Sequence, residues 1–110
     1  MFYKKSFRNL SNEEITEREL QEKIQKGAIL IDVRSNQEYR EGHLKGAINI
    51  PDFEIQNEIQ RKIPRKEQLI ILYCQNGSRS KNASNIMKKM GYTNVFNLKN
   101  GIQNKIAYKF

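Results

Sequence analysis

The chain has 110 residues, of which 37% are hydrophobic and 29% are charged, and its formal net charge is +8. This length supports one domain with its own core and is too short for a second catalytic unit, so we expect a single domain over residues 1–110 with its core at 12–102. No apolar run approaches the roughly 18 residues of a membrane span, and the basic start has no apolar stretch behind it, so neither a membrane anchor nor a secretory signal is expected.

The first helix and strand follow from local signals. Thr16 and Glu19 form a capping-box pattern, which predicts a helix that runs to about Lys26 and stops at Gly27. Residues 29–33 are apolar and predict a buried strand. The preceding residues 1–10 alternate weakly, which leaves open an edge strand or a frayed terminus.

A second capping-box pattern, at Ser35 and Glu38, predicts a short helix that Gly42 ends. The apolar residues at 48 and 50 then predict a brief strand closed by Pro51.

The second half repeats this alternation. A helix is predicted over 53–63, ending before Pro64, with an apolar face made of Phe53, Ile55, Ile59 and Ile63. Residues 69–73 predict a strand buried on both faces, 81–90 a helix, and 95–98 a final core strand. The order of elements predicts an α/β fold with a mostly parallel sheet of about five strands flanked by helices.

Cys74 is the only cysteine, and it lies between the carboxyl end of a predicted strand and the amino end of a predicted helix. The unpaired N–H groups and the dipole of a helix start favour negative charge, so a thiolate and an anionic substrate would both be stabilised there. Thiols in such positions have pKa values of roughly 3.5 to 7.5, against about 8.5 when free. We therefore expect an exposed, deprotonated nucleophile at position 74, whereas a buried structural cysteine is the alternative.

The residues after the cysteine favour the functional interpretation. Gly77 permits a backbone conformation closed to other residues, Ser78 is a candidate helix cap, and Arg79 brings a fixed charge to the same turn. We expect the loop N–H groups of residues 75–79 to hold a negative sulfur, and Ser78 and Arg79 to position an anionic donor. The predicted substrate-binding residues are Gln75, Asn76, Gly77, Ser78 and Arg79, with Ser80 in support.

Three motifs resemble those of the rhodanese-like sulfurtransferases. The string Cys74-x-x-Gly77-x-Arg79-Ser80 resembles the active-site loop of this family. Residues 31–51 are similar to its Asp-Val-Arg, Glu-Tyr and Gly-His-x-x-Gly-Ala-x-Asn-Ile-Pro signatures, and residues 91–102 resemble its closing strand and turn. The resemblance covers Asn12 to Ile102. One departure is Asn100-Gly101, where the family commonly has paired glycines, and we expect the turn to survive because asparagine tolerates left-handed backbone.

The resemblance implies a three-layer rhodanese-like fold and sulfur transfer through Cys74. Its thiolate would attack the outer sulfur of a donor such as thiosulfate, and the resulting persulfide would pass that sulfur to cyanide, a small thiol or a protein cysteine. No cofactor and no metal are implied. The family also assigns its Gly-His pair to the scaffold, so His43 is expected to be structural.

Two further residues lie where ligands of an open parallel sheet bind, at the carboxyl ends of strands. Arg34 is expected to form an ion pair, with Glu38 or another carboxylate, that fixes the neighbouring turn. Asp32 is expected to accept N–H bonds from the loop rather than to act as a base. Both are therefore predicted to support the site, and Tyr39 is predicted to belong to the core.

Rival functions remain open on the sequence. Cysteine-dependent phosphatases and arsenate reductases generally place the loop arginine six positions after the cysteine, whereas Arg79 is five positions after Cys74. A persulfide relay between protein partners, or an interaction module, is the other alternative.

The lysines are scattered along the chain, which indicates a solvated surface that attracts small anions and acidic partners within a Debye length of about 10 Å. No arginine-rich run or aromatic stacking platform indicates nucleic-acid binding. The single free thiol favours a cytoplasmic, reducing compartment, and the small size favours a monomer.

Overall fold

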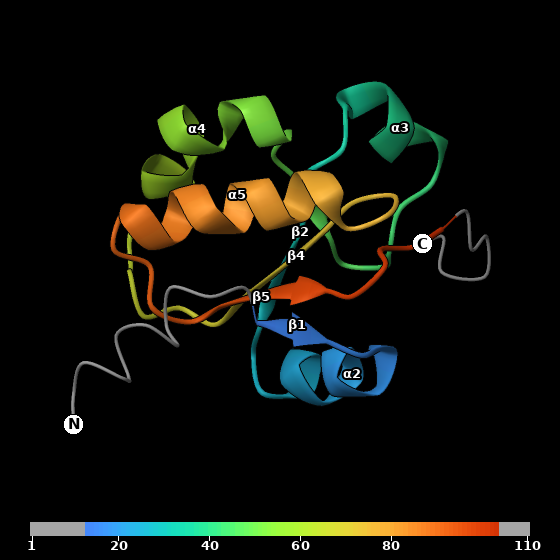
Figure 1. The fold of residues 1–110 in the computed structure, drawn as a ribbon, viewed down its shortest axis with the longest axis horizontal. Coiled ribbons are helices and arrows are strands. Elements are labelled where there is room, and N and C mark those ends of the chain that lie inside the picture. The colour runs from blue at the N-terminus through green and yellow to red at the C-terminus, as the bar shows by residue number, and fades with distance from the viewer. Residues whose placement is uncertain (1–12, 104–110) are drawn as a thin grey trace.

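A computed structural model describes residues 13–103, and these form three layers (Figure 1). The strands are β1 (Glu14–Ile15), β2 (Ile29–Asp32), β3 (Ile48–Asn49), β4 (Ile70–Tyr73) and β5 (Val95–Leu98). The helices are α2 (Glu17–Gln25), α3 (Asn36–Glu41), the 3-10 turn η1 (Asp52–Glu54), α4 (Ile55–Lys62) and α5 (Ser78–Lys89). The predicted domain ends at 1–10 and 104–110 lie outside the described residues.

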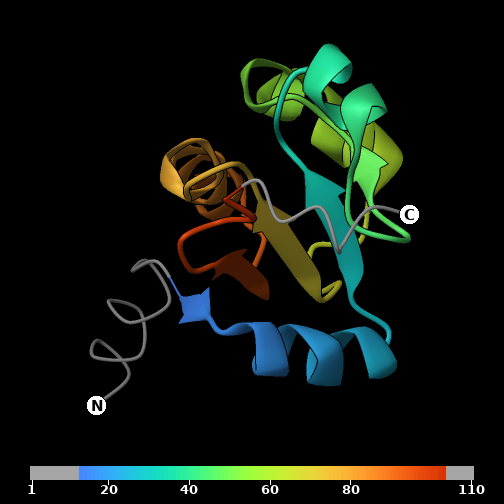
Figure 2. The same ribbon diagram turned by 90° about the vertical axis from the view of Figure 1, so that its right-hand side faces the viewer.

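The five strands form one sheet in the order β1-β5-β4-β2-β3, and every neighbouring pair is parallel. Helix α2 lies on one side of the sheet, and α4 and α5 lie on the other (Figures 1 and 2). The predicted fold class, a mainly parallel five-stranded sheet between helices, is therefore confirmed. Parallel strands align their carboxyl ends at one edge, which is where the predicted site residues lie.

Two apolar layers hold the sheet between the helices. The layer under α4 and α5 contains Ile31, Val33, Ile50, Ile55, Ile59, Ile63, Ile70, Leu72, Cys74, Ala83, Met87, Tyr92 and Val95. The opposite layer contains Ile15, Leu20, Leu30, Leu44, Ala47, Ile71, Tyr73, Leu98 and Ile102. Successive residues of β4 alternate between the two layers, as expected for side chains that point to opposite faces of a strand. Position 74 thus follows Ile70 and Leu72 into the layer under α5.

Both predicted capping boxes are present. In the first, Glu19 N donates to Thr16 Oγ1 over 3.2 Å, and Thr16 N donates to Glu19 Oε1 over 2.8 Å. In the second, Glu38 N donates to the Ser35 hydroxyl oxygen over 3.2 Å, and Glu38 Oε1 accepts from Ser35 N over 3.0 Å. Each box satisfies N–H groups that a helix start leaves unpaired, which explains why α2 and α3 begin where they do.

Two predicted element boundaries differ from the structure, and one short strand was not predicted. Phe53 was placed on the apolar face of a helix, but it lies in the η1 turn and is 74% exposed, because the helix itself begins only at Ile55. Helix α5 begins at Ser78, three residues before the apolar periodicity starts. Strand β1 went unpredicted, because two residues carry too little pattern to identify a strand.

Within residues 13–103, no helix is both long and apolar enough to span a lipid bilayer.

Candidate active site

Cys74 directly follows β4 and is fully buried. The prediction of an exposed side chain was therefore wrong. Strand alternation explains the burial, because position 74 faces the same way as Ile70 and Leu72 and lies beneath α5. The predicted position, between a strand's carboxyl end and a helix's amino end, is nevertheless where the side chain lies.

The sulfur of Cys74 accepts main-chain N–H groups at the start of α5. Gly77 N lies 3.1 Å from Sγ, and Ser80 N lies 3.4 Å from it. Gly77 is the N-cap residue and has no side chain to cap the helix, so the sulfur occupies the place that a capping oxygen usually takes. This arrangement stabilises negative charge on the sulfur at the positive end of the helix dipole.

Ser78 is not the helix cap that the sequence suggested, since it is the first residue inside α5. The side chain of Asn76 acts in its place. Its Oδ1 accepts from Ser78 N over 3.0 Å and from the Ser78 hydroxyl over 2.9 Å. The loop therefore satisfies two of the first helical N–H groups, those of Ser80 and Ser78, with a cysteine sulfur and an asparagine oxygen.

Residues 100–103 back the loop closely. Ile102 N donates to Cys74 O over 3.1 Å, and Gln103 N donates to Gln75 O over 2.8 Å. A Cβ atom added at Gly101 would lie 2.4 Å from Cys74 O, so only glycine fits at that position. Asn100 adopts φ +63°, which confirms that the Asn100-Gly101 turn survives without a second glycine.

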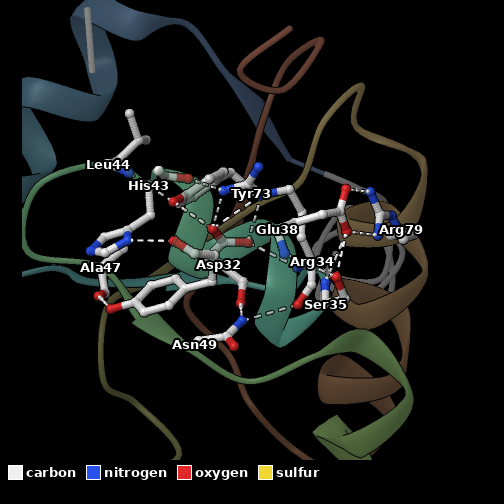
Figure 3. Close-up of polar contacts among 12 residues, drawn as sticks. Asp32, Arg34, Ser35, Glu38, His43, Leu44, Ala47, Asn49, Tyr73 and Arg79 are labelled. Carbon is white, nitrogen blue, oxygen red and sulfur yellow. Dashed lines mark hydrogen bonds and ion pairs between the residues drawn. The ribbon is translucent and has the colours of Figure 1, made fainter. Parts of the chain in front are cut away.

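The Arg79 guanidinium forms an ion pair with Glu38 (Figure 3). Its Nη1 donates to Glu38 Oε1 over 2.7 Å and its Nη2 donates to Glu38 Oε2 over 3.0 Å. The hydrogen bonds from Arg79 lower the pKa of Glu38 to about 2. This two-point ion pair joins α3 to the start of α5 across 41 residues of sequence, and the positioning of the donor by Arg79 stays a prediction.

Asp32 and Arg34 form a second, buried ion pair at the end of β2 (Figure 3). Arg34 Nη2 lies 2.7 Å from Asp32 Oδ2, and Arg34 N donates to Asp32 Oδ1 over 2.9 Å. The Tyr73 hydroxyl donates to Asp32 Oδ2 over 2.8 Å, and burial together with the Asp32 charge raises the pKa of Tyr73. Both residues thus support the turn as predicted, and the partner of Arg34 is Asp32 rather than Glu38.

Neighbouring side chains tie the same turn together. Asn49 Nδ2 donates to Asp32 O over 2.8 Å and to Arg34 O over 3.0 Å. His43 Nδ1 lies 2.8 Å from Tyr39 O, and the two rings stack with centroids 3.7 Å apart. The Tyr39 hydroxyl donates to Ala47 O over 2.6 Å. These contacts agree with structural roles for His43 and Tyr39.

Ser80 and Asn97 extend the contacts of the sulfur into the core. Cys74 Sγ lies 3.5 Å from the Ser80 hydroxyl oxygen, and that hydroxyl in turn donates to Asn97 Oδ1. All three side chains are fully buried. The sequence predicted Ser80 as a site residue but not Asn97. The signal that could have identified Asn97 is its polar side chain inside the otherwise apolar strand β5.

These features define a class of protein, namely a three-layer α/β domain with a cysteine held by the main chain at a helix start. The family model for the rhodanese-like domain matches residues 16–106, and the chain belongs to that family. Among residues 13–103, no group of three or more His, Cys, Asp or Glu side chains is arranged to hold a metal ion.

Known relatives share this domain. Thiosulfate sulfurtransferase PspE of Escherichia coli is 42% identical over 67 residues, which cover 61% of this chain and 64% of PspE, just under two thirds. Thiosulfate sulfurtransferase GlpE of Haemophilus influenzae is 33% identical over 93 residues, covering 84% of this chain and 86% of GlpE. The structure of human single-domain sulfurtransferase TSTD1 superposes with a TM-score of 0.75 at 26% identity, covering 88% of this chain and 97% of TSTD1.

Proposed function

We propose that this protein is a sulfurtransferase that carries a sulfane sulfur as a persulfide on Cys74. The observation that carries the proposal is the pair of N–H groups, from Gly77 and Ser80, that point at the cysteine sulfur at the start of α5. A core cysteine requires no such donors, whereas a thiolate or a persulfide anion is stabilised by them. Membership of the rhodanese-like family, and the thiosulfate sulfurtransferases among its relatives, support the same assignment.

The loading step is a displacement at sulfur. The Cys74 thiolate attacks the outer sulfur of thiosulfate, the S–S bond of the donor breaks, and sulfite leaves with the bonding electron pair. The product is Cys74–S–S⁻, so the total charge is the same before and after the step. The main-chain donors of the loop stabilise the negative sulfur without any cofactor.

The unloading step transfers the terminal sulfur to a nucleophile. Cyanide, a small thiol or a protein cysteine attacks that sulfur, and the Cys74 thiolate is the leaving group. A persulfide relay to a protein partner uses the same two steps and differs only in its acceptor. The two roles are separated by rate, since a relay turns over slowly with cyanide and quickly with its proper thiol.

The burial of Cys74 limits which donors react. Because the side chain is fully buried, a donor reaches the sulfur only when neighbouring atoms move aside, which favours a small donor with a terminal sulfur. The formal net charge of +8 attracts anions such as thiosulfate to the domain as a whole. The charge of Arg79 contributes to this attraction, but its guanidinium is already bound by Glu38.

The same ion pair argues against a phosphatase. A phosphatase loop uses its arginine to bind two oxygens of a tetrahedral oxyanion, and Glu38 already accepts one N–H group from each terminal nitrogen of Arg79. We therefore expect no hydrolysis of a generic aryl phosphate above the background rate.

The proposal is tested by intact-protein mass spectrometry after incubation with thiosulfate. Wild-type protein should gain one sulfur atom, about 32 Da, and lose it on addition of cyanide or a small thiol. Cys74→Ser is the matched control, because it changes one atom of the only cysteine and should gain nothing. The same gain on Cys74→Ser, or no gain on wild type, would contradict the proposal.

A further inference from the structure

The buried hydrogen-bond chain behind the nucleophile ends in an unpaired group. It runs from Cys74 Sγ through the Ser80 hydroxyl to Asn97 Oδ1. In the part of the chain that the structure describes, Asn97 Nδ2 is buried and has no hydrogen-bond partner. Native proteins pair nearly all such groups, so an unpaired amide next to a nucleophile requires an explanation.

Three groups lie within hydrogen-bond distance of the Ser80 hydroxyl, which has a single proton. They are Asn97 Oδ1, Gly77 O at 3.2 Å and Cys74 Sγ at 3.5 Å. While Cys74 keeps its proton, its S–H group can donate to the Ser80 oxygen, and the Ser80 proton is then available to Asn97 Oδ1 or Gly77 O.

When Cys74 is a thiolate, its sulfur needs a hydrogen-bond donor instead of an acceptor. Once Cys74 has lost its proton, the sulfur can only accept, and the Ser80 hydroxyl stabilises it only by turning its proton toward the sulfur. The Ser80 oxygen then has a free lone pair facing Asn97. A 180° rotation of the Asn97 amide exchanges Oδ1 for Nδ2, so that the otherwise unpaired N–H group donates to that lone pair.

We propose that Asn97 is a positioning residue whose side-chain amide reverses with the charge on Cys74, holding the Ser80 proton away from the thiol and directing it at the thiolate. This inference extends the proposed function, because the thiolate is the species that attacks the donor. No proton passes along the chain: the thiol proton leaves to solvent, and the Ser80 and Asn97 protons remain on their own atoms.

Asn97 and Ser80 both lie on rigid secondary-structure elements, which makes the coupling between their side chains specific. Asn97 lies in β5, paired with Leu72 of β4 and Glu14 of β1, so its backbone is fixed on both sides of the strand. Ser80 lies in the first turn of α5, directly after the loop. The side-chain amide is therefore the part free to turn, about the bond between Cβ and Cγ.

The test is a pH titration of thiolate absorbance in the ultraviolet, with Cys74→Ser as the blank. Because the chain has a single cysteine, the difference signal reports one thiol. Asn97→Leu keeps the branched shape and removes both polar atoms. The hydrogen bond that supports the charged thiolate is stronger than the one made beside the neutral thiol, so its loss should raise the titration midpoint by about half a pH unit to one unit. If Asn97 instead held the Ser80 proton in both states, its removal would release that proton to the thiolate, and the midpoint would fall. A fall or no change overturns the inference.

Ser80→Ala provides the second arm of the experiment. Removing the hydroxyl should raise the midpoint by about one to two pH units, since a hydrogen bond to a charged group is lost. Adding Asn97→Leu to Ser80→Ala should then change nothing, because Asn97 acts only through Ser80. If the midpoint shifts of the two single variants add up in the double variant, Asn97 does not act through Ser80, and the inference is contradicted.

Ser84→Ala is the matched control for packing. Ser84 lies one helical turn after Ser80, and its hydroxyl is also buried and without a partner among residues 13–103. Its removal should leave the midpoint unchanged, which separates a general effect of the core from the action of Asn97. Circular dichroism reports folding of each variant, and Asn97→Ala replaces Asn97→Leu if the latter is unfolded.

The titration requires no sulfur donor, so the two proposals fail separately. A protein that gains sulfur but whose midpoint falls in Asn97→Leu contradicts the role of Asn97 alone. A midpoint that rises in a protein that never gains sulfur contradicts the sulfurtransferase assignment alone.

Discussion

The polar groups at the ends of the adjacent strands β2 and β4 differ in how completely they are hydrogen-bonded. At the end of β2, the Asp32 carboxylate accepts from the main chain and guanidinium of Arg34 and from the Tyr73 hydroxyl (Figure 3). At the end of β4, the chain of contacts from Cys74 ends in an amide nitrogen of Asn97 that is unpaired within the described residues. A network in which every polar group is hydrogen-bonded fixes one geometry, whereas a network with an unpaired group can exchange partners.

The backbone shows the same contrast. The turn after β2 is held by Asn49, which donates to two carbonyl groups of that turn. The loop after β4 instead contains Gly77 at φ +99° and is backed by Asn100 and Gly101, both at φ +63°. Three residues with positive φ therefore meet at the loop that holds the cysteine, where the chain must approach the sulfur closely. The β2 end therefore serves as scaffold and the β4 end as the reactive site.

The largest expected effect is on stability, at the scaffold end. Asp32→Ala leaves the buried Arg34 guanidinium without its carboxylate and should cost about 3 to 5 kcal/mol in the free energy of unfolding. Urea denaturation measures this loss. The sulfur gained per folded molecule should stay near the wild-type level, because within residues 13–103 the cysteine sulfur makes its hydrogen bonds to Gly77 and Ser80 and none to Asp32.

Asp32→Asn sharpens this prediction. It keeps an oxygen that accepts from Arg34 N and removes only the charge, so its loss of stability should be smaller than that of Asp32→Ala. An Asp32→Asn variant that folds as stably as wild type but cannot be loaded with sulfur would break the division between scaffold and reactive site.

The next effect should combine stability with activity, at the reactive end. Gly101→Ala places a methyl group 2.4 Å from Cys74 O and 2.5 Å from Gln75 C, so the loop must shift. We expect a loss of about 2 to 3 kcal/mol in the free energy of unfolding together with a strong loss of sulfur loading.

Gly27→Ala is the matched control for that variant. Gly27 also has a positive φ, +93°, but nothing lies within 4 Å of an added Cβ. It should cost only the backbone strain, about 1 kcal/mol, and leave loading unchanged. Equal losses of loading in the two variants would mean that close packing behind the loop does not matter.

The accuracy of the sequence predictions followed the range of the interactions involved. The capping box at Thr16 and the strand over 95–98 were predicted correctly, because their signals lie within a few residues. The position of Cys74 at a strand-to-helix junction was also correct. Its burial was only the alternative prediction, since nothing in the loop itself indicates how closely α5 covers the strand end.

Long-range pairing could not be predicted from the sequence. The partner of Arg34 was left open between Glu38 and another carboxylate; the fold gives it Asp32, and it pairs Glu38 with Arg79. The exposure of Phe53 has a local origin, because the predicted helix begins two residues too early, in a segment that folds as η1. Which partner a polar side chain meets depends on strand order and helix placement, and these are set by the whole core.

The smallest expected effect concerns the ion pair that joins the scaffold to the reactive site. Glu38→Gln keeps the capping box, because glutamine serves at that position, and removes the charge that binds Arg79. Since the folded pKa of Glu38 is about 2 against 4.5 for the free group, the pair stabilises the protein fully above pH 4.5. Its contribution is lost as the pH falls toward 2. Each side chain is about one-third exposed, so solvent screening limits the contribution to about 1 kcal/mol.

Urea denaturation of wild type and Glu38→Gln at pH 7 and pH 3 checks this prediction. The difference in unfolding free energy between the two proteins should be about 1 kcal/mol at pH 7 and smaller at pH 3. Glu58→Gln is the control, because Glu58 pairs with the exposed Arg61 on α4, far in sequence from the loop, and should change stability by less than about 0.5 kcal/mol. A difference for Glu38→Gln that does not shrink at pH 3 would mean that its carboxylate stabilises the fold by something other than charge, and that the two strand ends are not linked by this ion pair.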